Sequence, residues 1–173
     1  MCGQGEGLEI PSPAAAATMR FVSRFVVQLH DATTLHFDLR LEAGGVLRSW
    51  AVPKGPSLDP AVKRLAVPVA DHSFTAGDFE GVYEGSSRGS GAVIIWDEGT
   101  VEITRDEPEH LSFTLAGRKL AGRFGLTRTD ERRWILVKAR DEHARPGSDI
   151  VEEQPASVRS GRTWQELADV RAR

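Results

Sequence analysis

Hydrophobic and polar residues alternate strictly along residues 35–42, LHFDLRLE. One parity carries only leucine and phenylalanine, and the other carries His36, Asp38, Arg40 and Glu42. Because successive side chains of a strand point to opposite faces, the pattern predicts a half-buried strand. Neighbours on its polar face lie about 6.5–7 Å apart along the strand. The side chains of His36 and Asp38 can therefore lean onto one ion, with Arg40 one step beyond.

A second alternating run, residues 25–30 (FVVQLH), ends at His30. The two runs predict a β-hairpin with a loop of about four or five residues. A five-residue loop sets His30 opposite His36 on one face, whereas a four-residue loop sets it opposite Leu35 on the other face. In the first arrangement the two imidazoles and Asp38 suit a divalent ion such as Mn²⁺, Zn²⁺ or Fe²⁺. In the alternative, the histidines only pack and form hydrogen bonds, and spacing alone leaves both interpretations open.

Further strands are expected at regular intervals along the chain. Turn signals separate apolar segments every eight to twelve residues, which indicates a mainly antiparallel barrel or sandwich. Within this pattern Glu98-Gly99 is expected to be a hairpin turn. The expected strands are residues 46–52, 64–72, 91–97, 101–104, 111–115, 120–126 and 134–138.

The strand at residues 64–72 is expected at a sheet edge because Pro68 has no N–H to donate. Arg64 and His72 share parity in it and would face one side unless a bulge intervenes. Residues 140–160 are polar and loop-like, and the capping box of residues 163–166 (TWQE) predicts a short C-terminal helix.

Length and composition predict one folded domain with flanking segments. We expect a disordered tail at residues 1–18, a β-domain at 19–144, and a C-terminal loop and short helix at 145–173 packed on the same domain. No apolar run reaches about 18–20 residues, no signal peptide is apparent, and Cys2 is the only cysteine, so a cytoplasmic location is expected. Lysine and arginine total 22 against 25 acidic residues, so any contact with nucleic acid must come from a local patch.

Several ordered motifs resemble the 3′-phosphoesterase domain of bacterial and archaeal DNA ligase D and its free-standing relatives. The likeness spans about residues 21–144, with a fainter echo in 155–167. The motifs are FVVQ at 25–28 leading to His30, LHFDLRLE at 35–42, SWAVPKGPS at 49–57, KRLAV at 63–67, DH at 71–72, DFEG at 78–81, WDEGT at 96–100 and WILVK at 134–138.

The resemblance implies a compact antiparallel β-barrel of about eight strands that repairs 3′ ends of DNA or RNA. It implies a Mn²⁺-dependent enzyme, with Zn²⁺ or Co²⁺ as alternatives. A phosphodiesterase step removes a terminal ribonucleoside, and a phosphomonoesterase step then removes the 3′-phosphate. Carried over by position, the metal ligands are His30, His36 and Asp38. The phosphate-binding and catalytic residues are Arg40, Lys54, Arg64 and His72.

One position and one segment depart from the pattern of the resembled family. Members commonly carry a tyrosine four residues after the histidine that aligns with His72, and here that position is Ala76. The segment at 82–89 also differs from the family pattern, and Tyr83 and Arg88 are candidates to compensate.

The expected partners are 3′ ends of nucleic acid, together with ligase, polymerase and end-binding repair proteins, with no membrane contact and a monomeric chain. The alternative function is a non-catalytic end-binding module that retains the metal site, which Ala76 favours. A barrel phosphatase for small molecules fits less well because the cations are dispersed along the chain.

Overall fold

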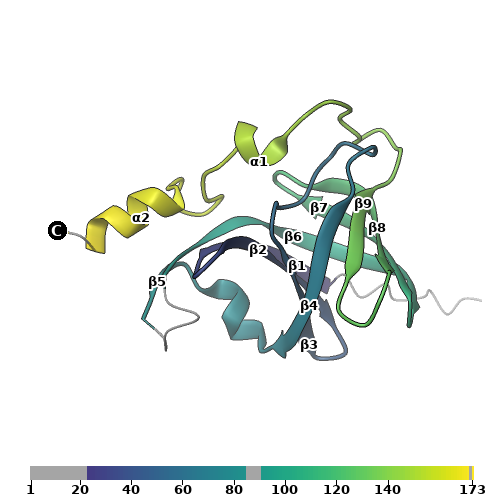
Figure 1. Cartoon of the computed structure of the whole chain (residues 1–173), viewed down its shortest axis with the longest axis horizontal. Coiled ribbons are helices and arrows are strands. Elements are labelled where there is room, and N and C mark those ends of the chain that lie inside the picture. The colour runs from purple at the N-terminus through teal and green to yellow at the C-terminus, as the bar shows by residue number, and fades with distance from the viewer. Residues whose placement is uncertain (1–22, 85–90, 172) are drawn as a thin grey trace, which may run out of the picture.

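The computed structural model describes residues 23–84, 91–171 and 173, so the expected disordered tail at residues 1–18 lies outside the described residues. Strands dominate this part of the chain, with one 3₁₀ helix, η2, and two short α-helices (Figure 1). The elements are β1 (Ser23–Asp31), β2 (Leu35–Ala43), β3 (Val46–Val52), β4 (Arg64–His72), η2 (Phe74–Asp78), β5 (Gly81–Tyr83), β6 (Gly91–Glu107), β7 (His110–Gly117), β8 (Ala121–Arg128), β9 (Trp134–Lys138), α1 (Ile150–Glu153) and α2 (Trp164–Arg171).

Eight of the strands form a closed antiparallel barrel. Their order is β1-β2-β3-β4-β9-β8-β7-β6, and pairing of β6 with β1 closes the ring. The short strand β5 adds to the beginning of β6. Closure pairs the strand edges that an open sheet would expose. The predicted barrel of about eight strands with a short C-terminal helix is confirmed.

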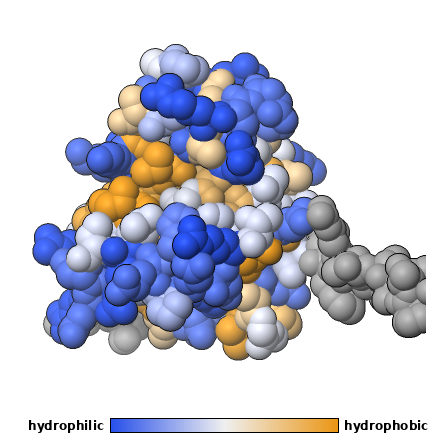
Figure 2. Space-filling model, turned by 90° about the vertical axis from the view of Figure 1, so that its right-hand side faces the viewer, coloured by the Kyte–Doolittle hydropathy of each residue, from blue (hydrophilic) through white to orange (hydrophobic). Residues whose placement is uncertain are grey.

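Strand alternation decides which side chains fill the barrel. On β2, Phe37, Leu39 and Leu41 are buried in the core, whereas the polar parity points away from it. Leu35, at the beginning of the strand, is 38% exposed and lies outside this core. Hydrophilic side chains cover much of the face in Figure 2, with a band of hydrophobic surface between them.

The expected turn at Glu98-Gly99 is wrong. Strand β6 continues through these residues and pairs with β5, β1 and β7 along its length. A Cβ atom on Gly99 would lie 2.0 Å from the carbonyl oxygen of Ala116 on β7. The glycine therefore allows close approach of two strands instead of reversing the chain.

Strand β4 lies between β3 and β9, but β9 pairs only with its first three residues, Arg64 to Ala66. Pro68 lies beyond them, where β3 is the one paired neighbour among the described strands, so the edge character expected from proline is local. In the register with β3, Ser49 pairs with Val69 and Leu47 pairs with His72, which inserts one extra residue into β4. This bulge reverses the side on which His72 lies relative to Arg64.

The C-terminal segment packs against the barrel. Helix α1 lies inside the stretch expected to be loop-like, and α2 begins at the predicted capping box. The Thr163 N–H donates to Glu166 Oε2 at 2.9 Å, and the Glu166 N–H donates to Thr163 Oγ1 at 3.3 Å. Trp164 and Leu167 then pack against the core. Among the described residues, none of the helices has the length and apolar character needed to cross a membrane.

Candidate metal and phosphate site

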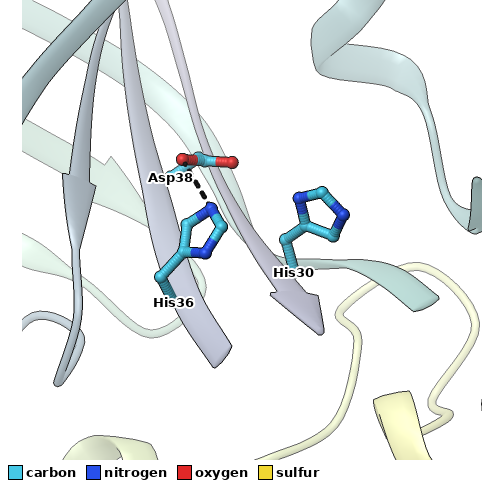
Figure 3. Close-up of side chains that lie close together, drawn as sticks. All are labelled: His30, His36 and Asp38. Carbon is cyan, nitrogen blue, oxygen red and sulfur yellow. Dashed lines mark ion pairs between the residues drawn. The ribbon is translucent and has the colours of Figure 1, made fainter. Parts of the chain in front are cut away.

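The β1–β2 hairpin brings two histidines and one carboxylate together (Figure 3). His30 pairs directly with His36, the register in which both imidazoles share a face with Asp38. The ring centroids of the two histidines are 5.2 Å apart. One potential ligand atom from each of the three residues lies within 4.8 Å of the others, and in the described part of the chain this is the one such cluster.

Hydrogen bonds orient His36 within this cluster. Its Nδ1 lies 2.8 Å from the Thr34 carbonyl oxygen, to which a protonated Nδ1 donates. Nε2 then faces Asp38 Oδ1 at 3.3 Å. The hydrogen bond to Asp38 raises the pKa of His36, although burial opposes the rise. When a metal displaces the Nε2 proton, the contact with Thr34 keeps the ring in place, as is usual for histidine ligands.

Two imidazole nitrogens and one carboxylate oxygen form a donor set that suits divalent ions such as Mn²⁺, Zn²⁺ or Fe²⁺. Bonds of about 2.0–2.2 Å to a common ion require ligand atoms somewhat closer together than the present limit of 4.8 Å. Rotation of the half-buried His30 and His36 side chains can supply that small change. The three residues therefore fit a metal with further positions open to water or substrate.

Arg40 connects the metal cluster to the rest of the site. Its side chain is buried, and its Nη2 donates to Asp38 Oδ2 at 3.3 Å. Nε donates to Gln28 Oε1 at 2.7 Å, and Nη1 donates to Ser49 Oγ at 3.0 Å. Burial lowers the pKa of Arg40, and Asp38 partly offsets the decrease. The guanidinium thus holds Asp38 in place and keeps a positive charge beside the cluster.

The bulge in β4 brings His72 to the same place. Its Nδ1 lies 3.0 Å from Arg40 Nη1 and 2.7 Å from the Ala70 carbonyl oxygen. An unprotonated Nδ1 accepts from Arg40, whereas a protonated Nδ1 donates to Ala70. His72 therefore joins the site through a bulge that strand parity alone did not reveal.

Gln28 has a structural role that sequence reasoning missed. While its oxygen accepts from Arg40, its Nε2 donates to the carbonyl oxygens of Ala76 and Phe79 at 3.0 and 2.9 Å. It thereby joins the barrel to the segment around η2. The available signal was its parity with His30, which gives it a place on the polar face of β1.

His30, Asp38, Arg40, His72 and Gln28 line one cavity of about 540 Å³, and His36 adjoins it through its contact with Asp38. Its polar part is formed by β1, β2 and β4, and its apolar part comes largely from η2, β5 and their flanks. The lining residues are Gln28, His30, Asp38, Arg40 and His72 on the polar side, and Val69, Ala76, Phe79, Tyr83 and Val93 on the apolar side.

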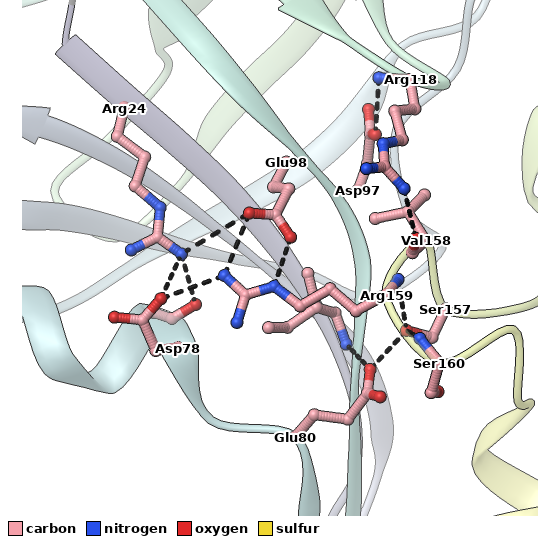
Figure 4. Close-up of polar contacts among 12 residues, drawn as sticks. Arg24, Asp78, Glu80, Asp97, Glu98, Arg118, Ser157, Val158, Arg159 and Ser160 are labelled. Atoms are coloured by element: carbon pink, nitrogen blue, oxygen red, sulfur yellow. Dashed lines mark hydrogen bonds and ion pairs between the residues drawn. The ribbon is translucent and has the colours of Figure 1, made fainter.

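An ion-pair network fixes the wall formed by η2 and the residues after it (Figure 4). Asp78 pairs with both Arg24 on β1 and Arg159 in the C-terminal segment. Arg159 also pairs with Glu98, and the carboxylates of Glu98 and Asp78 raise the pKa of Arg159. Glu80 accepts hydrogen bonds from the Ile95 N–H and the Ser157 hydroxyl. The C-terminal segment therefore stabilises one wall of the cavity, a role its sequence did not indicate.

Two expected cations, Lys54 and Arg64, are not among the residues that line this cavity. Lys54 is exposed in the turn after β3, and it does not line the cavity. Arg64 shares strand parity with the buried Ala66 and is likewise absent from the lining. Arg88 falls outside the described residues. The structure thus gathers His30, His36, Asp38, Arg40 and His72.

The amino-acid sequence is similar to that of known proteins over most of the chain, including the residues of this site. The family model described as "DNA Ligase D 3'-phosphoesterase domain" matches residues 28–128. The chain is 52% identical over 151 residues to the "Multifunctional non-homologous end joining protein LigD" of Pseudomonas aeruginosa, covering 81% of this chain. It is 37% identical over 136 residues to the corresponding DNA repair protein of Mycobacterium tuberculosis, covering 76% of this chain. In each case the match covers 18% of the relative's length.

Proposed function

Since the chain belongs to the DNA ligase D 3′-phosphoesterase domain family, we propose that it is a metal-dependent phosphoesterase that heals 3′ ends of nucleic acid during DNA end joining. It removes a 3′-terminal ribonucleoside and then the 3′-phosphate that remains, leaving a 3′-hydroxyl. The relatives carry non-homologous end joining in their names. Ligase, polymerase and end-binding proteins are accordingly the proposed partners.

One observation carries this proposal: two members of the three-residue metal cluster, His30 and Asp38, line the same cavity as the buried guanidinium of Arg40, which contacts Asp38. A phosphoester is anionic, and its charge is redistributed over its oxygens during transfer. Fixed positive groups directed at those oxygens lower the barrier. His30, His36 and Asp38 would hold the metal, with Mn²⁺ the proposed ion. When bound, such an ion supplies positive charge at the phosphate and lowers the pKa of a coordinated water.

The other side chains have distinct proposed roles. Arg40 positions Asp38 and His72 through its hydrogen bonds, and it adds positive charge beside the phosphate. In the diesterase step water adds to phosphorus, the bond to the 5′-oxygen of the terminal nucleoside breaks, and that oxygen takes up a proton. His72 can donate this proton or hydrogen-bond a phosphate oxygen. Lys54 and Arg64 provide outer positive charge for the nucleic-acid strand.

The test uses two primer–templates, one ending in a 3′-ribonucleotide and the other in a 3′-phosphate. With Mn²⁺ present, the first should be converted to a 3′-phosphate and then to a 3′-hydroxyl, and the second directly to a 3′-hydroxyl. His36→Ala should abolish both reactions, whereas His143→Ala, which changes an exposed histidine outside the cavity, should retain them. Equal activity of the two variants would refute the assignment of the site.

The alternative is an end-binding module without efficient turnover. Ala76 favours it, because this residue lines the cavity where the resembled family carries a phenol. Tight binding of the 3′-phosphate end without phosphate release by the wild-type protein would support this alternative.

A further inference from the structure

The cavity is larger than a phosphate requires. Its total volume of about 540 Å³ lies within the range of roughly 300–1,000 Å³ found for small-molecule sites. A phosphate would use the histidines and Arg40 but would leave the aromatic wall without a partner. That wall adjoins the charged groups in one continuous cavity. A ligand that fills both parts must carry an apolar surface next to its phosphate.

Phe79 and Tyr83 form the exposed part of this wall. Their rings contact each other edge to face, with centroids 6.2 Å apart and planes at 82°. The residues nevertheless remain 39% and 49% exposed, respectively. Exposed aromatic side chains beside a polar site are typical of surfaces that bind a ligand.

The wall is also held in a defined position. The Phe79 carbonyl accepts a hydrogen bond from Gln28, which in turn accepts one from Arg40. Tyr83 lies on β5 and pairs with Gly91 of β6. One chain of hydrogen bonds thus connects the aromatic wall to the charged part of the cavity. Such an arrangement fixes the separation between a phosphate and a planar group attached to it.

We propose that Phe79 and Tyr83 bind the base of the 3′-terminal nucleoside, the group that leaves in the diesterase step. This inference rests on the proposed function and defines a subsite for it. The terminal nucleoside is joined to the scissile phosphate through its 5′-oxygen, so its base is a planar group within reach of the wall. Stacking on aromatic rings depends little on base identity. The subsite therefore accepts each of the four bases and distinguishes a nucleoside from a bare sugar or a free phosphate end.

The test compares three ends on one primer–template: a 3′-ribonucleotide, the same ribose without its base, and a 3′-phosphate. Stacking of one base corresponds to about a 5- to 150-fold advantage in kcat/KM for the complete nucleotide over the abasic ribose. Phe79→Ala and Tyr83→Ala should reduce this ratio toward one. Hydrolysis of the 3′-phosphate should stay within about twofold of wild type, because that substrate has no terminal base.

Matched variants separate stacking from other effects. Phe74→Ala removes another exposed phenylalanine, one that lies on η2 outside the cavity lining, and should leave the ratio unchanged. Phe79→Leu retains apolar volume without a ring and should behave like Phe79→Ala. Tyr83→Phe retains the ring and should behave like wild type. If the phenol of Tyr83 instead contacts phosphate, Tyr83→Phe will slow phosphate release and the base assignment of Tyr83 fails.

Binding provides a readout that does not depend on turnover. A 3′-terminal 2-aminopurine ribonucleotide, mixed with His36→Ala protein in the presence of a chelator, should lose fluorescence as its base stacks. A double variant that carries both His36→Ala and Phe79→Ala should not quench this fluorescence. Quenching without turnover by wild-type protein would refute the proposed function but support the base contact. Turnover with an unchanged base-to-abasic ratio in Phe79→Ala would overturn the base contact alone.

Discussion

Arg40→Lys tests whether the shape of the guanidinium, beyond its charge, organises the site. Arg40 directs its nitrogen atoms to Gln28, Ser49, Asp38 and His72 at distances of 2.7 to 3.3 Å. A lysine ammonium is a single point on a flexible stem and cannot reproduce this planar set of contacts. The substitution should therefore leave buried polar groups without their donors.

The magnitude follows from those contacts. Hydrogen bonds that involve a charged group contribute about 1.5–3 kcal/mol each, so losing two of them lowers the free energy of unfolding by about 3 kcal/mol or more. For a domain of this size, that loss corresponds to a decrease in Tm of about 6–12 °C. Loss of a donor that organises the phosphate site should also slow phosphate release by about 100- to 1,000-fold. Thermal unfolding and a 3′-phosphate release assay measure the two effects.

Arg48→Lys is the matched control. Arg48 Nη1 contacts both Asp106 oxygens at 3.1 Å, but this pair lies on the surface. Exposed pairs contribute about 0–1 kcal/mol, so the control should shift Tm by only a few degrees. Equal Tm values for the two variants would refute the proposed structural role of Arg40. A large decrease in Tm with unchanged phosphate release would restrict Arg40 to stabilising the fold.

Three further predictions concern the rates, stability and binding of this protein. Because Ala76 removes a phenolic donor relative to the resembled family, the 3′-phosphate intermediate should accumulate in a time course. Ala76→Tyr should speed phosphate release more than ribonucleoside removal. An unchanged rate of phosphate release in this variant would show that another group fills the role of the phenol. Asp141 lies beside the fully buried Lys138; burial opposes ionisation, but hydrogen bonds outweigh it and lower the pKa of Asp141 to about 2. The contribution of Asp141 to stability should be present above about pH 4 and be lost as the pH falls toward 2. Asp141→Asn should lower the free energy of unfolding, measured by urea unfolding near neutral pH, by about 3–5 kcal/mol. Affinity for 3′-phosphate DNA should fall with salt at a log–log slope of about −2 to −4, since few cations serve the site, and a slope near −8 in a titration would contradict a small patch.

Features that depend on neighbouring residues were predictable from the sequence. Alternation in residues 35–42 identifies a strand with His36 and Asp38 on one face, and the structure has this arrangement. The capping box at residues 163–166 marks the beginning of α2. These features follow from the period of a strand and from the unpaired N–H groups at a helix end, both of which act over a few residues.

Features that depend on contacts between distant segments were decided by the tertiary structure. Whether Gly99 turns the chain or allows close approach depends on Ala116, which lies on another strand. The side on which His72 points depends on a bulge whose register is set against β3. The wall carrying Phe79 is held by Arg159, far along the chain. Local periodicity carries no information about which distant backbone will pair, because barrel closure and side-chain packing select those partners only once the whole chain is assembled.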